Sequence, residues 1–192
     1  MRAVSVVAVI GVMLAGCGSS SQPAAPAAAA SASPATSPVE ATLATLSRTQ
    51  RVHQLLMPSI DSLNPGAARA VIRATRPGGL IIMAPGTARQ WRRVVRAAQD
   101  EASKLGLPPL LIGADQENGT LVQRMRLPVT LPGAMVLGAA VAGDAERGSG
   151  AAAELAEVTG NWLAAGGVNI DFAPVADVNV RPSNPVIGIR SP

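Results

Sequence analysis

The sequence predicts an α/β fold built around a parallel sheet. Three short apolar runs have the length and composition of buried strands, and segments with helical periodicity separate them. The apolar runs are continuous and do not alternate with polar residues, so we expect helices to cover both faces of the sheet. The order of strand, helix and strand favours parallel strands joined by right-handed crossovers. A barrel and an open doubly wound sheet both fit this order.

The expected elements occupy residues 40–192. In chain order they are helix 40–57, helix 65–75, strand 79–84, helix 88–105, strand 110–114, helix 147–165 and strand 168–175. Thr87 is the expected N-cap of the third helix, and Gly106 has the position of a glycine that ends it. About three strands are therefore expected.

Composition narrows the classes of function. The 192 residues are 48% hydrophobic and 15% charged, which provides enough apolar material for one domain with a buried core. The net charge is +4, but the basic residues are spread along the sequence, without the basic stripe typical of nucleic-acid-binding proteins. No glycine-rich nucleotide-binding loop follows any expected strand. We therefore expect no nucleic-acid partner and no dinucleotide cofactor.

The first 17 residues have the pattern of an export signal. Arg2 precedes an apolar run over 3–15, which spans about 20 Å as a helix, whereas a bilayer core is about 30 Å thick. The run leads into LAGC at 14–17, which resembles the lipobox of bacterial lipoproteins and implies acylation of Cys17, the sole cysteine. We therefore expect an exported protein, anchored by lipid to the outer face of the cell membrane. A plain signal peptide is the alternative. Residues 18–39, rich in Ser, Ala and Pro, are expected to form a tether.

Polar residues follow two of the expected strands. Asp115 comes directly after strand 110–114, with Glu117 just beyond it, and segment 171–179 carries further carboxylates. Active sites of parallel α/β folds form at the carboxyl ends of the strands. These carboxylates are therefore candidates for a functional site. The alternative is that they cap helices or brace loops.

Three motifs resemble one family. The runs GGLIIMAP (78–85), IGADQENG followed by VQR (112–124) and DFAPVADVNVRPSNPVIGIRS (171–191) are similar to motifs of the N-terminal domain of glycoside hydrolase family 3, in its bacterial β-N-acetylhexosaminidase branch. The resemblance implies the first part of a (β/α)8 TIM-type barrel, incomplete in this chain. It also implies hydrolysis of glycosidic bonds, without metal or cofactor, in N-acetylglucosaminides derived from the cell wall.

The resemblance assigns roles to single residues. Asp115 matches an aspartate that hydrogen-bonds sugar hydroxyls, and Arg124 and Arg190 match arginines that line the same sugar site. The chemistry is suitable because a carboxylate accepts hydroxyl protons in a fixed geometry and a guanidinium offers a planar fork of donors. A solvated surface position is the alternative for both arginines. Asp177 and Asn179 are expected to have structural roles.

The sequence departs from the family pattern between Asp115 and Arg124. These residues are nine positions apart, whereas the family spacing is eight, and the additional residue falls at Thr120 or Leu121. We expect either a loop that absorbs this residue or a displaced Arg124. Asn118 replaces the first of two glycines, which is a mild change because asparagine tolerates left-handed backbone.

The chain carries no candidate for the catalytic pair. The resemblance implies an aspartate nucleophile late in the barrel and a histidine acid near a Lys-His-x-Pro-Gly-His-Gly motif, and neither is recognisable in these 192 residues. The sole histidine, His53, lies before the first expected strand. A complete barrel has eight strands in about 250 residues, so we expect a truncated chain that is inactive alone. A non-catalytic sugar-binding lipoprotein, a degenerate gene remnant and an unrelated tethered α/β domain are the alternatives.

Overall fold

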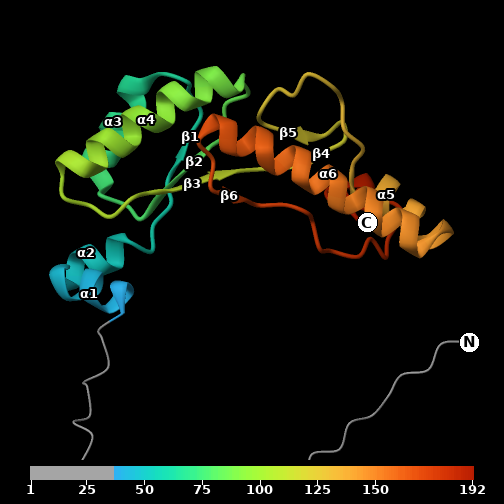
Figure 1. Ribbon diagram of the computed structural model, residues 1–192, viewed down its shortest axis with the longest axis horizontal. Coiled ribbons are helices and arrows are strands. Elements are labelled where there is room, and N and C mark those ends of the chain that lie inside the picture. Colours follow the sequence, from blue (N-terminus) through green and yellow to red (C-terminus); the bar gives the residue numbers. More distant parts are fainter. Residues whose placement is uncertain (1–36) are drawn as a thin grey trace, which may run out of the picture. The chain divides into compact units, whose positions relative to one another are not determined.

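A parallel sheet of four short strands forms the centre of the protein (Figure 1). The computed structural model describes residues 37–192, so the predicted export signal and residues 18–36 lie outside the described residues. The strands run in the spatial order β1-β2-β3-β6, and all three pairs are parallel. Their bounds are β1 Ser59–Ile60, β2 Gly79–Ile82, β3 Leu111–Ala114 and β6 Ile170–Asp171. All four carboxyl ends therefore face the same side of the sheet.

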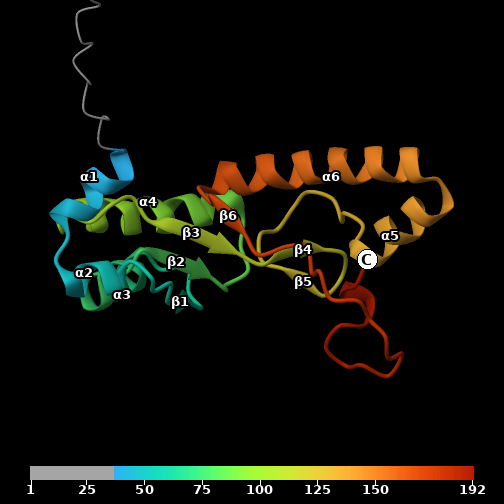
Figure 2. The same cartoon turned by 90° about the horizontal axis from the view of Figure 1, so that it is seen from below.

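Helices connect the successive strands, as predicted. Their bounds are α1 Pro38–Thr45, α2 Arg48–His53, α3 Pro65–Thr75, α4 Ala88–Lys104, α5 Ala134–Gly143 and α6 Ala145–Gly166, and a 3-10 turn, η1, spans Gly188–Arg190. α3 packs on α4, and α4 packs on α6. Figures 1 and 2 both show α5 at the end of α6 that is remote from the sheet. No helix within residues 37–192 is long and apolar enough to cross a membrane.

The core lies between the sheet and the inner faces of α3 and α4. Trp91 and Val94 of α4 and Ile72 of α3 are fully buried, in one cluster with Leu80 and Ile112 of the sheet. The buried residues of α4 recur with the helical period, so the opposite face of this helix is left to solvent. The sheet is thus held by helices whose apolar stripes could be recognised in the sequence.

The ends of α4 confirm two predictions. The Thr87 hydroxyl accepts a hydrogen bond from the backbone N–H of Gln90, and the Gln90 side chain accepts one from the Thr87 N–H, which completes a capping box. Gly106 follows the helix with a φ of 66°, a left-handed conformation that favours glycine. Local capping therefore sets the length of α4.

The first helical segment differs from the prediction. Residues 40–57 do not form one helix, because α1 and α2 are separated at Leu46 and Ser47. Leu46 is extended, with φ −94° and ψ 133°. The Ser47 side chain then accepts a hydrogen bond from the Gln50 N–H and starts a second capping box. A strong N-cap inside a loosely spaced apolar pattern explains the break.

The sheet has four strands where about three were expected. The strands predicted at 79–84 and 110–114 are β2 and β3, but the strand predicted at 168–175 is reduced to the two residues of β6. β1 was missed because two residues show no periodicity. The antiparallel hairpin of β4 Gln116–Asn118 and β5 Val122–Gln123 was also missed, as was α5, whose apolar residues surround the helix without forming a stripe.

Candidate functional site

The carboxyl ends of β3 and β6 bring two aspartates together. Asp115 directly follows β3, and Asp171 is the last residue of β6, where it pairs with Ala114. The Asp171 carboxylate accepts a hydrogen bond from the Gln116 N–H at 2.9 Å. The Phe172 N–H donates to the Ala114 carbonyl at 2.8 Å. The parallel register therefore joins the two polar segments that the sequence indicated as candidates.

The side chain of Gln116 holds the segment directly after β5, which carries Arg124. Gln116 is only 1% exposed. Its Oε1 accepts hydrogen bonds from the backbone N–H groups of Arg124 and Met125, at 3.0 and 2.9 Å. These bonds satisfy polar groups that are removed from water, as buried groups require. They fix the backbone of Arg124 relative to the end of β3.

Arg124 and Asp115 form an ion pair. Nη2 of Arg124 lies 3.9 Å from Oδ2 of Asp115, and the two side chains are 32% and 23% exposed. The separation is too long for a direct hydrogen bond, so both groups retain polar atoms for a ligand. Nε of Arg124 is buried and has no hydrogen-bond partner within residues 37–192. The pair therefore presents an acceptor and several donors at one place.

The β4–β5 hairpin absorbs the additional residue of this segment. Gln116 pairs with Gln123, whereas Asn118 pairs with Val122, so the register shifts by one residue inside the hairpin. Asn118 and Gly119 adopt left-handed backbone, with φ of 61° and 68°. A shift of one residue equals the excess over the family spacing. Arg124 still lies 3.9 Å from Asp115 across this hairpin.

Arg190 reaches the same region through Glu117. Its Nε and Nη2 donate to the two carboxylate oxygens of Glu117 at 2.7 and 2.6 Å, and its Nη1 donates to the Val186 carbonyl at 3.1 Å. The hydrogen bonds with Glu117 raise the pKa of Arg190 against the effect of burial, and the charges of Glu117, Asp177 and Asp115 raise it further. Arg190 therefore lies close enough to Asp115 for their charges to interact.

Asp171 is the third carboxyl group of this region, beside Asp115 and Glu117. Burial raises its pKa above the ordinary value of 3.8, and the negative charges of Asp115 and Glu117 act in the same direction. The backbone N–H groups of Gln116 and Phe172 lower the pKa in part. Asp171 therefore keeps its proton to a higher pH than an exposed aspartate.

Two cavities adjoin Glu117. One, of about 500 Å³, is lined by Glu117, Arg190 and the segments 118–121 and 130–136. The other, of about 560 Å³, is lined by β4, α5 and α6 and includes Asp171. Both have mainly apolar walls, and volumes of this size suit a small molecule. The Asp115–Arg124 pair lies outside the linings of these two cavities.

Sequence inspection missed the residue that organises the site. Gln116 was not singled out, because the sequence does not show that its side chain is buried. Asp177 is exposed, while the Asn179 N–H donates to the Ser191 hydroxyl at 3.1 Å and so braces the segment before Arg190. Within residues 37–192, no group of three or more His, Cys, Asp or Glu side chains is placed to hold a metal ion.

The chain is similar to one protein family and to individual proteins of known activity. The family model of the glycosyl hydrolase family 3 N terminal domain matches residues 48–191. Beta-hexosaminidase A of Pseudoalteromonas piscicida is 40% identical over 96 residues, which are 50% of this chain and 15% of that protein. Beta-hexosaminidase of Alkalilimnicola ehrlichii is 36% identical over 124 residues, which are 64% of this chain and 34% of that protein.

A solved structure has the same architecture. The glycoside hydrolase family 3 beta-N-acetylglucosaminidase from Paenibacillus sp. is 40% identical, with a TM-score of 0.65 over 76% of this chain and 27% of that structure. The chain thus spans well under two thirds of each of these three relatives. The four parallel strands correspond to part of the barrel-like N-terminal domain, so the barrel is incomplete here. Since the family model covers most of its length, the chain belongs to glycoside hydrolase family 3.

Proposed function

We propose that this chain forms the sugar-binding side of a β-N-acetylhexosaminidase-type site. Its ligand is a terminal N-acetylglucosamine of a saccharide derived from the cell wall. The two β-hexosaminidases and the β-N-acetylglucosaminidase to which the chain is similar support this substrate class. The reaction of the complete site, hydrolysis of a glycosidic bond with retention, is part of the same proposal.

The observation that carries this proposal is the ion pair between Asp115 and Arg124. The two residues lie 3.9 Å apart at the carboxyl end of β3, although the hairpin between them has an additional residue. The carboxyl ends of parallel strands are where α/β folds bind their ligands. In the proposed site, Asp115 accepts protons from sugar hydroxyls and Arg124 donates to neighbouring sugar oxygens.

Arg190 supplies the second group of donors in the proposed site. Glu117 and Val186 occupy three of its five N–H groups. The remaining two donors are available to a ligand in a fixed orientation. Because the family's nucleophile and histidine acid are not recognisable in this sequence, we propose that the chain binds the sugar without cleaving it.

Binding of N-acetylglucosamine to the full chain, followed by ligand-observed NMR, tests this proposal. The variant Asp115→Asn loses the charged acceptor, and a charged hydrogen bond contributes about 1.5–3 kcal/mol, so we expect its affinity to fall at least tenfold. Asp100→Asn is the matched control, because Asp100 is exposed on α4, away from the strand ends. Equal affinities of Asp115→Asn and the unmodified chain would overturn the proposal.

An assay with an aryl N-acetylglucosaminide separates binding from catalysis. We expect no hydrolysis by the chain that binds the sugar. Hydrolysis that disappears in Asp115→Asn but persists in Asp100→Asn would contradict the non-catalytic part of the proposal and would locate a catalytic pair in this chain.

We also propose that the protein is exported and anchored by acyl chains on Cys17. The support is the order of Arg2, the apolar run 3–15 and the small residues before the sole cysteine. Mass spectrometry of the peptide that begins at Cys17 tests the proposal. Acyl groups on this peptide are expected, and their loss, with release of the protein from membranes, is expected in Cys17→Ser. An unmodified cysteine in the membrane-bound protein would contradict it.

A further inference from the structure

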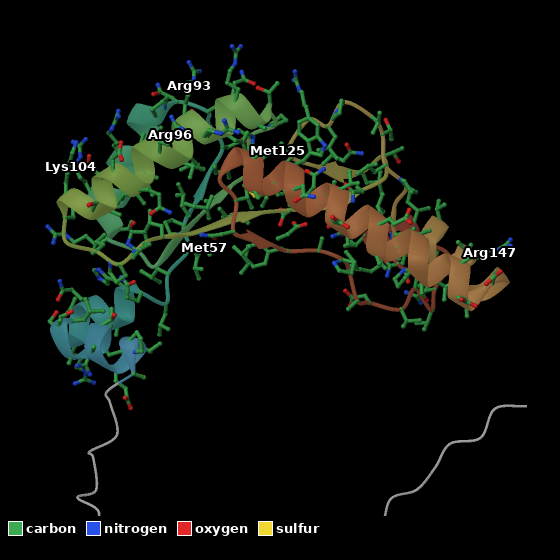
Figure 3. The ribbon with its side chains drawn as sticks, in the orientation of Figure 1. Met57, Arg93, Arg96, Lys104, Met125 and Arg147 are labelled. Atoms are coloured by element: carbon green, nitrogen blue, oxygen red, sulfur yellow. The ribbon has the colours of Figure 1, made fainter. Side chains whose placement is uncertain are left out.

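The outer face of α4 is a surface of exposed arginines. Helical periodicity places six charged residues on this face, and all of them are exposed. They are Arg89, Arg92, Arg93, Arg96, Asp100 and Lys104. Figure 3 shows Arg93, Arg96 and Lys104 on the outer side of α4. We call the four arginines of this helix the α4 arginine face. In the sequence these arginines are interspersed with other residues, and the helix brings them onto one face.

Of these four arginines, Arg92 alone has a side-chain hydrogen bond within residues 37–192: its Nε donates to the Ala165 carbonyl at 2.7 Å and joins α4 to the end of α6. Arg89 and Arg93, like Arg92 and Arg96, are like charges four positions apart, and such pairs destabilise a helix. Arg89 also lies in the first turn of α4, where the helix dipole disfavours cations. Arg89, Arg93 and Arg96 form no salt bridge with any residue of the described range 37–192. The arrangement is therefore unfavourable unless an external anion neutralises it.

The neighbouring helix and the charge balance extend this surface. α3, which packs on α4, adds Arg69 and Arg73, and Arg76 follows as its C-cap residue. Of these three, Arg73 alone forms a salt bridge within residues 37–192, with Glu101 at 2.7 Å. Residues 65–104 contain eight basic and two acidic side chains, a net charge of +6. Residues 105–192 contain five basic and eight acidic side chains, a net charge of −3. The positive charge of the protein is thus concentrated on one helix pair.

We propose that the α4 arginine face docks on the anionic phospholipid headgroups of the membrane surface. A guanidinium group pairs with a phosphate through two parallel hydrogen bonds, and nearly all basic residues of this surface are arginines. The proposed anchor at Cys17 brings this partner within reach, because only residues 18–37 separate Cys17 from the start of α1. The proposal is independent of the sugar site, which uses no residue of α4.

Co-sedimentation with lipid vesicles tests the proposal on the full chain. All proteins carry Cys17→Ser, so that no acyl group contributes, and residues 1–16 are the same in each. The test variant combines Arg89→Gln, Arg93→Gln and Arg96→Gln. The matched control combines Arg48→Gln, Arg126→Gln and Arg181→Gln, which removes the same charge from exposed positions outside α4. Unfolding followed by the fluorescence of the buried Trp91 verifies that both variants fold.

We expect binding to vesicles of phosphatidylglycerol and phosphatidylcholine to weaken roughly 100-fold in the test variant, since each arginine near an anionic surface contributes roughly a fivefold factor. The control is expected to weaken less than tenfold, and 0.5 M salt should abolish the difference. Equal losses in both variants would overturn the proposal, because they would show a diffuse charge effect. Equal binding to pure phosphatidylcholine, or tighter binding to a single-stranded oligonucleotide, would also overturn it.

Discussion

The carboxylate of Glu117 accepts two hydrogen bonds from the guanidinium of Arg190, from Nε at 2.7 Å and from Nη2 at 2.6 Å. The pair joins the β4–β5 hairpin to η1, and the two residues are 73 positions apart in the sequence. A bidentate pair fixes the plane of the guanidinium as well as its position. Glu117 therefore determines in which direction the two remaining N–H groups of Arg190 can meet a ligand.

A double-mutant cycle on this pair tests its positioning role. We expect Glu117→Gln and Arg190→Lys each to lower the affinity for N-acetylglucosamine about tenfold, because each removes the bidentate geometry. The double variant should lose little more than either single variant, because the residues act as a unit. Glu157→Gln, on the exposed face of α6, is the control and should leave the affinity unchanged. If the fold-loss of affinity in the double variant equals the product of the two single fold-losses, the two residues are not coupled and the prediction is contradicted.

Gln116 is expected to stabilise both the fold and the site. Gln116→Leu removes the acceptor for two backbone N–H groups, those of Arg124 and Met125. We expect the free energy of unfolding to fall by about 2–4 kcal/mol, since each buried donor without an acceptor costs about 1–3 kcal/mol. Denaturant unfolding followed by fluorescence of the buried Trp91 measures this change. A loss below about 0.5 kcal/mol would show that other groups satisfy these donors.

Helices with an apolar stripe and strands with a continuous apolar run could be predicted from the sequence. α3 begins and ends at the residues expected for it, and α4 was predicted from its apolar stripe and its caps. The two strands of four residues, β2 and β3, were also found from their continuous apolar runs. β1 and β6 were missed or overestimated because two paired residues are defined by the neighbouring strand, not by a pattern of their own.

The candidate site could be predicted only in part. The positions of Asp115, Arg124 and Arg190 followed from motifs, because each lies within or directly beside a recognisable run. The contacts could not be predicted from the motifs, because the Glu117–Arg190 pair and the Asp171–Gln116 hydrogen bond join segments that are more than 50 positions apart. Such partners are set by the packing of η1 and β6 near the hairpin, which sequence periodicity does not describe.

Asn118 is expected to contribute to the stability of the fold through its backbone conformation and its side chain. Its φ is 61°, and its Nδ2 donates to the hydroxyl of the buried Thr159 at 2.9 Å. Asn118→Ala loses the hydrogen bond and keeps the strained backbone, so we expect a destabilisation of about 1–2 kcal/mol. Asn118→Gly loses the same bond but relieves the backbone, and should be about 1 kcal/mol more stable than Asn118→Ala. Equal unfolding free energies of the two variants would contradict this interpretation.

The half-buried carboxyl group of Asp171 is expected to make stability depend on pH. Its pKa is raised by burial in the folded state, so the folded protein binds more protons than the unfolded chain above the ordinary value of 3.8. Its contribution to stability is thus fully present below that pH and is lost as the pH rises through the folded-state pKa. Asp171→Asn should match the unmodified protein at pH 3.5 and be more stable at pH 7. The reverse order at pH 7 would contradict the raised pKa.

The most direct measurement is the side-chain NMR spectrum of the arginines during titration with N-acetylglucosamine. The Nε–H signals of Arg124 and Arg190, assigned through Arg124→Lys and Arg190→Lys, should shift with a common dissociation constant. Those of Arg48 and Arg181, which lie outside the proposed site, should stay constant, and Asp115→Asn should abolish the shifts. Binding that leaves Arg124 and Arg190 unperturbed, or shifts only arginines elsewhere, would contradict the assignment of a sugar site to the carboxyl ends of β3 and β6.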